Sequence, residues 1–87
     1  MNDMSDSLSR DDAEATVRSA LRGFAPAADL ADLAADAPLR ATLDLDSLDF
    51  LTFVERLTTA TGIRIDESDY PNLATIHTCV EFLATRA

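Results

Sequence analysis

The stretch DSLDFLTFVERLTTATG, at positions 46–62, predicts a helix more clearly than any other part of the chain. Asp46 stands where a helix N-cap is expected, and Gly62 is a residue that commonly ends a helix in the left-handed conformation. Between them, four apolar residues recur at the spacing that places them on one face of a helix. We therefore expect a helix over about 47–61 whose buried face consists of Phe50, Phe53, Val54 and Leu57.

The same helix carries a second apolar strip that this core does not need. At 100° per residue, Leu48 and Leu51 fall roughly 160° and 100° away from Phe50, beside the acidic residues Asp49 and Glu55. Scattered exposed leucines are normal on protein surfaces. The alternative is a recognition surface, because an apolar strip bordered by charges is typical of a binding site.

Two further helices are predicted on either side of this one. The first begins near Asp11, where Glu14 three residues later suggests a capping box, and the last is capped by Thr75. Each has an apolar stripe at helical spacing. The stripe of the first helix is Ala13, Val17, Leu21 and Phe24, and that of the last is Ile76, Cys79, Val80 and Leu83.

The segments between the helices are less regular. Residues 25–46 contain Pro26 and Pro38, and we expect a long connection with one helical turn near 29–34. Residues 66–70 can form a short helical turn that Pro71 limits. The connection is expected to be pinned to the core by four leucines, Leu30, Leu33, Leu39 and Leu43.

The predicted fold class is therefore all-α. A chain of 87 residues is one domain, and its pattern indicates a small four-helix bundle, with three main helices, one short helix before the last, and a long first loop. Residues 1–9 are polar without periodicity, and we expect a flexible N-terminal tail there. The folded domain is predicted to cover 10–87.

Net charge excludes several functions. Sixteen Asp and Glu oppose seven Arg, with no Lys, so the formal net charge is −9. Such a chain cannot assemble the basic patch that nucleic acids or anionic lipids require. The charge is densest over 43–70, which holds seven acidic residues and two Arg. An acidic surface of this kind suits partners with basic surfaces.

Metal sites and self-contained catalysis are also disfavoured. One Cys with one His cannot form a zinc site, and the acidic run at 66–69 lacks the spacing of a calcium loop, so a solvated turn is expected. Ser47 lies thirty residues from His77, the one His of the chain, so no base activates it. Cys79 is expected to be a small buried hydrophobe. We predict no metal, no catalytic activity and, without a signal-like start, a cytoplasmic location.

The run LDLDSLDF, at positions 43–50, resembles the Asp-Ser-Leu attachment motif of acyl carrier proteins. The resemblance covers roughly 11–86 and includes the helix ahead, the long connection, the Gly62-Ile63-Arg64-Ile65 link and the closing helix led by Thr75. The chain is thus similar to discrete, stand-alone acyl carriers. In that family the serine receives a 4′-phosphopantetheine arm from coenzyme A, and the thiol of the arm holds acyl groups as thioesters.

The resemblance implies roles for particular residues. Ser47 is the expected attachment site, and Asp46 matches the residue that assists the metal and coenzyme A complex of the modifying enzyme. The family often has Gly where this chain has Asp44, and Arg56 and Arg64 interrupt the acidic surface. The residues that fall where the family docks its partners are Leu48, Asp49, Leu51 and Glu55.

The implied function is that of an acyl carrier protein in fatty-acid or polyketide biosynthesis. Its expected partners are a phosphopantetheinyl transferase and acyltransferases, ketosynthases or acyl-activating ligases with basic docking surfaces, and we expect a monomer. Two alternatives remain: an aminoacyl or peptidyl carrier, and an acidic helical adaptor without an arm. The first is disfavoured because peptidyl carriers usually lack an acidic residue directly before the serine, where this chain has Asp46.

Overall fold

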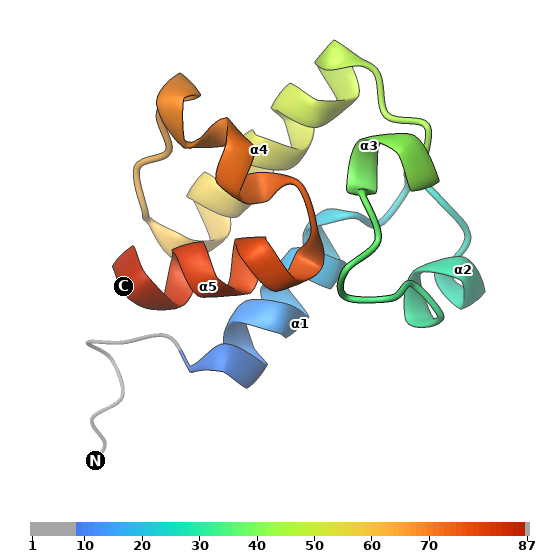
Figure 1. Ribbon diagram of the computed structural model, residues 1–87, viewed down its shortest axis with the longest axis horizontal. Helices are drawn as coiled ribbons and strands as arrows, with labels where there is room; N and C mark the ends of the chain where they lie inside the picture. The colour runs from blue at the N-terminus through green and yellow to red at the C-terminus, as the bar shows by residue number, and fades with distance from the viewer. Residues whose placement is uncertain (1–8, 87) are drawn as a thin grey trace.

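The computed structural model describes residues 9–86, and it confirms the predicted all-α bundle. The predicted flexible tail lies outside the described residues, except for Ser9. Three long helices form the body of the molecule, and three short helices complete it (Figure 1). The elements within 9–86 are α1 (Arg10–Ala20), α2 (Ala27–Ala31), α3 (Leu39–Thr42), α4 (Ser47–Thr61), the 3₁₀ helix η2 (Glu67–Leu73) and α5 (Ile76–Arg86).

The core forms where the apolar stripes of the long helices meet. α1 packs against both α5 and α4, and η2 packs against α5. The predicted stripes of α4 and α5 are buried, and Phe82 joins them. Burial of each such side chain contributes on the order of 1.5–3 kcal/mol, so these helix faces dominate the stability. The largest fully buried side chains are Phe53, Leu21, Leu39, Leu57, Leu73, Ile76, Leu83, Val17 and Cys79.

The N-cap of helix α1 lies two residues before the one that the sequence indicated. Its N-cap is Ser9, whose hydroxyl oxygen accepts a hydrogen bond from the Asp12 N–H at 3.0 Å. The predicted capping box of Asp11 and Glu14 is therefore wrong, because Ser9 already satisfies the free N–H groups of the first turn. Glu14 instead forms an ion pair with Arg18 one turn later.

The end of α1 is closed by a residue from α4. The Arg56 guanidinium donates to the carbonyl oxygens of Ala20 and Arg22 at 3.0 and 2.7 Å, and it lies 4.8 Å from the centre of the Phe24 ring. Carbonyls at a helix C-terminus lack partners within the helix, so a cation there is favourable. Arg56 thus holds α1 to α4 and covers one face of the half-buried Phe24 ring.

The long connection contains two short helices, α2 and α3, where the sequence predicted one turn at 29–34. Pro26 and Pro38 stand at the N-caps of these helices, so each proline starts a helix. Its fixed φ suits a helix start, and its missing N–H costs nothing there. Three of the four predicted anchors, Leu30, Leu33 and Leu39, are buried, and Leu43 packs partly against the core.

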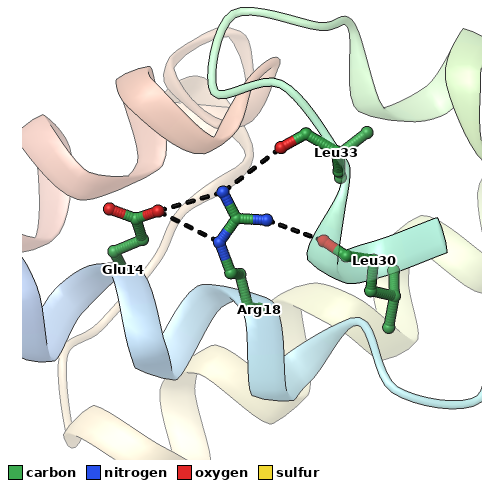
Figure 2. Close-up of polar contacts among 4 residues, drawn as sticks. All are labelled: Glu14, Arg18, Leu30 and Leu33. Atoms are coloured by element: carbon green, nitrogen blue, oxygen red, sulfur yellow. Dashed lines mark hydrogen bonds and ion pairs between the residues drawn. The ribbon is translucent and has the colours of Figure 1, made fainter. Parts of the chain in front are cut away.

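Arg18 ties this connection to α1, as Figure 2 shows. On one side its guanidinium contacts Glu14, with both Nε and Nη2 lying 3.0 Å from Oε2. On the other side Nη1 donates to the Leu30 carbonyl at 2.7 Å, and Nη2 donates to the Leu33 carbonyl at 3.2 Å. These two carbonyls belong to the end of α2 and the turn after it. The planar Arg18 guanidinium therefore provides hydrogen bonds to the Leu30 and Leu33 carbonyl oxygens in this connection.

The far end of the connection is held by the backbone of other elements. The Leu39 N–H donates to the Ala74 carbonyl, and the His77 N–H donates to the Ala35 carbonyl, both at 2.8 Å. These bonds place α3 beside the junction of η2 and α5, although the chain between them includes all of α4 (Figure 1). The position of α3 is thus set by contacts far apart in the sequence.

The turn between α3 and α4 passes through Asp44, whose φ is +55°. This is the left-handed region, which Gly adopts freely and which Asp tolerates better than most residues. The family resemblance placed a Gly here, and the backbone of this chain does adopt the conformation that a Gly would favour. The turn is closed by the Leu45 N–H, which donates to the Arg40 carbonyl at 2.9 Å, and Leu45 itself is buried.

The short helix before α5 is longer than predicted. It is a 3₁₀ helix that continues through Pro71 to Leu73, whereas the sequence suggested that Pro71 would limit it at Tyr70. A proline removes one backbone N–H donor, so η2 continues through Pro71 with at most one of its hydrogen bonds lost. Ile63 and Ile65 in the preceding link pack partly against the core, as their alternation indicated.

Replacing Arg18 tests the tether of the connection. In Arg18→Lys, a compact ammonium cannot reach Glu14 and both carbonyls in the same fork geometry. We expect the free energy of unfolding to fall by about 1–2 kcal/mol, measured by urea denaturation. Arg22→Lys, at an exposed arginine near the same helix end, is the matched control and should change stability little. Equal losses in the two variants would contradict the role of the Arg18 fork.

Replacing Asp44 tests the left-handed turn. Asp44→Val should lower the free energy of unfolding by about 1–2 kcal/mol, because a β-branched side chain clashes with the backbone at positive φ. Asp44→Gly should be at least as stable as the parent protein in thermal denaturation. Asp44→Asn separates charge from conformation, since it removes the charge but tolerates the same φ. If Asp44→Asn lowered the free energy of unfolding as much as Asp44→Val, the charge of Asp44, and not its backbone conformation, would be what matters at this position.

Candidate functional site

The start of α4 is defined by two reciprocal hydrogen bonds. The Asp46 carboxylate accepts from the Asp49 N–H at 2.8 Å, and the Asp49 carboxylate accepts from the Asp46 N–H at 3.4 Å. This capping box confirms Asp46 as the N-cap. Ser47 is then the first residue of the helix, and it is exposed. Its hydroxyl is thus presented to solvent at the positive end of a 15-residue helix.

Ser47 lacks the partners that a self-activated nucleophile needs. No His or Cys lines the pocket beside it, where the one carboxylate is that of Glu67. His77 instead lines a separate groove with Glu81 and Arg86, between η2 and α5. Among the described residues, the Ser47 hydroxyl therefore has no neighbouring base of the kind that activates a nucleophile.

The four residues of the predicted docking surface lie on α4 as expected. Leu48 and Leu51 are 74% and 42% exposed, which makes them the exposed large hydrophobic residues of the described chain. We call this pair the exposed strip. Glu55 is exposed near it, whereas Asp49 is half-buried because it belongs to the capping box. Asp49 therefore supports the helix start in addition to any contribution of its charge to a surface.

A pocket of about 520 Å³ opens beside Ser47, between α3, α4 and η2. Its apolar lining includes Phe50 and Tyr70, whose rings meet edge to face at 5.3 Å. The sequence did not identify Arg40, Glu67 or Tyr70 as lining residues. Arg40 belongs to α3 and the other two to η2, and these elements meet only in the folded chain.

The acidic turn is structural in part. Asp69 is buried, and its carboxylate accepts from the Arg86 guanidinium at 2.9 Å and from the Asp66 N–H at 3.0 Å. The expected solvated turn is therefore wrong for Asp69, because burial of a carboxylate requires such partners. No group of side chains in residues 9–86 is arranged to hold a metal ion. Asp69 and Arg86 instead attach η2 to the last turn of α5.

Cys79 is inert in this environment. It is fully buried on the core face of α5, as predicted, and burial raises its pKa to about 12. The reactive form of a cysteine is the thiolate, which is scarce at neutral pH when the pKa is that high. Cys79 therefore packs as a small hydrophobe. The site is left with Ser47 as its distinctive group.

Comparison with known proteins agrees with this site. Neither the curated proteins nor the solved structures contain a match to the chain. Among the helices of residues 9–86, none has the length and apolarity to cross a membrane. A family model described as the phosphopantetheine attachment site matches residues 15–83, from the middle of α1 to the last turn of α5. This match covers most of the chain, and its members bear 4′-phosphopantetheine covalently on a serine. The chain therefore belongs to the phosphopantetheine attachment site family, and it is a phosphopantetheine carrier of the acyl or peptidyl carrier type.

Proposed function

We propose that Ser47 is the attachment site of the 4′-phosphopantetheine arm, and that the protein is an acyl carrier. The observation that carries the proposal is the exposed Ser47 hydroxyl at the first position of α4, directly after Asp46 and at the mouth of a pocket. Its neighbours cannot activate it, which suits a residue modified by another enzyme.

The modification is a transfer from coenzyme A. The Ser47 oxygen bonds to the phosphorus that bears pantetheine, and the pyrophosphate bond of coenzyme A breaks. The nucleotide 3′,5′-adenosine diphosphate leaves, and the hydroxyl proton passes to a base of the transferase. Asp46 remains free on its outer side to assist the metal and coenzyme A complex of that enzyme, since its hydrogen bond to Asp49 uses one oxygen.

The exposed strip and the acidic charge around it support transient docking. Leu48 supplies an apolar contact, and Glu55 supplies a charge that attracts basic partner surfaces. Carrier proteins work with phosphopantetheinyl transferases and biosynthetic enzymes. We propose that the latter are acyltransferases, ketosynthases or acyl-activating ligases of fatty-acid or polyketide biosynthesis, and that the carrier acts as a cytoplasmic monomer.

The pocket beside Ser47 favours an acyl cargo over an aminoacyl one. Its walls include the rings of Phe50 and Tyr70, so a cargo chain could leave water there. Asp46, directly before the serine, also favours an acyl cargo, because the family's peptidyl members usually lack an acidic residue at this position. An adaptor would function without a 4′-phosphopantetheine arm. Attachment of the arm to Ser47 therefore distinguishes both carrier functions from the adaptor function.

Incubation with a promiscuous phosphopantetheinyl transferase and coenzyme A tests the attachment. Intact-mass spectrometry should show a gain of one phosphopantetheinyl group in the parent protein and none in Ser47→Ala. Ser68→Ala, at an exposed serine of η2, is the control and should gain the same mass as the parent. An unmodified parent protein would eliminate both carrier functions and leave the adaptor. Loading with acyl and aminoacyl donors then separates the two carriers.

Charge reversal on α4 tests the docking surface. Glu55→Lys should lower kcat/KM of the transferase roughly 3–10-fold at low ionic strength, because long-range attraction speeds the encounter. Glu55 is preferred to Asp49 for this test because Asp49 also caps the helix. Asp11→Lys makes the same charge change in the first turn of α1, outside the α4 surface, and should have little effect. If both reversals slowed modification equally, net charge rather than this face would govern docking.

A further inference from the structure

The pocket beside Ser47 is built from three separate elements. Its volume of about 520 Å³ lies within the usual range for small-molecule sites, roughly 300–1,000 Å³. Ser47 stands at its edge, so any group attached there has direct access to it. The lining residues are Pro38, Arg40, Ser47, Phe50, Leu51, Glu67, Tyr70, Pro71 and Ala74.

Several contacts hold the walls of this pocket in place. The hydrogen bond from the Leu39 N–H to the Ala74 carbonyl joins the α3 wall to the segment after η2. The edge-to-face contact of Phe50 and Tyr70 joins α4 to η2. Because each wall is attached to another element, the pocket is part of the fold and not a gap between independent surface side chains.

Two opposite charges line this otherwise largely apolar pocket. Arg40 comes from α3 and Glu67 from η2. Within residues 9–86, neither side chain belongs to a salt bridge, so the two do not neutralise each other. The Arg40 guanidinium lies 5.5 Å from the centre of the Phe50 ring, where a cation is attracted to the ring face. Its N–H donors therefore border the same space as the aromatic wall.

A fully saturated chain leaves the polar part of this lining unused. Arg40 and Glu67 are both exposed and remain solvated, and such a chain would offer neither of them a hydrogen bond. A chain that bears hydroxyl or keto oxygens could accept from the Arg40 guanidinium, and a hydroxyl could also donate to Glu67. Its methylene groups would still pack against Phe50 and Tyr70.

We propose that the pocket selects acyl chains bearing hydroxyl or keto oxygens over saturated chains of the same length, with Arg40 as a specificity-determining residue. This inference rests on the proposed function, because it requires that Ser47 carry the arm and its cargo. It assigns a chemical class of cargo, which the attachment motif by itself does not indicate.

In the test, a promiscuous phosphopantetheinyl transferase transfers the acyl-phosphopantetheinyl group from octanoyl or 3-hydroxyoctanoyl coenzyme A to Ser47, with release of 3′,5′-adenosine diphosphate. The rate of thioester cleavage by hydroxylamine is then measured. Each cleavage rate is divided by the rate for the same acyl group on free pantetheine. This ratio removes the intrinsic reactivity of each thioester and measures only the protection that the protein gives. The 3-hydroxy chain should be protected about fivefold better than the saturated chain, the factor that one net hydrogen bond provides. In Arg40→Leu this preference should disappear, because the donors are lost while an apolar side chain remains against Phe50. Arg64→Leu, at a side chain that is 91% exposed, makes the same charge change and should keep the preference.

The outcomes separate this inference from the proposed function. Efficient loading with equal protection of the two chains, or a preference that survives in Arg40→Leu, would overturn the inference and leave the carrier function standing. Failure of Ser47 to accept any arm would overturn both. Circular dichroism checks that Arg40→Leu is folded, and Glu67→Leu serves as a second variant that should also weaken the preference.

Discussion

Two reciprocal hydrogen bonds between Asp46 and Asp49, of 2.8 and 3.4 Å, define where α4 begins, and the geometry of the site depends on that starting point. If the helix began one residue later, Ser47 would become the N-cap and would leave the first turn. The capping box therefore sets the position of the exposed serine, while helical spacing places the α4 stripe in the core. Asp44, in the left-handed conformation, forms the turn that connects α3 to this N-cap.

Most of the remaining polar contacts serve to attach irregular segments to this frame. Arg18 holds the end of α2, Arg56 closes α1, and Arg86 attaches η2 through Asp69. Arginine suits these positions because one guanidinium can satisfy several backbone or carboxylate oxygens. Arg18, Arg56 and Arg86 thus serve to join elements of the fold, while residues 43–70 around α4 still hold seven acidic residues against two Arg.

Sequence patterns predicted the long elements well and the short ones poorly. The stripe of α4 and its cap at Asp46 were readable because helical spacing and capping are local properties. The start of α1 was misplaced because two cap candidates, Ser9 and Asp11, stand two residues apart, and local preference does not choose between them. The sequence predicts a solvated Asp69 because no local pattern indicates its partner Arg86, which lies 17 residues away.

The sequence by itself determined the all-α class, the bounds of α4, the exposed strip and the serine at the helix start, because each follows from residues within a few turns of one another. Only the tertiary structure decided that Pro38, Arg40, Phe50, Glu67 and Tyr70 surround one pocket. These residues come from three segments, and their meeting depends on long-range packing and on bonds such as that from Leu39 to Ala74. No local pattern specifies such contacts, because their free energy arises only when the separate elements are assembled.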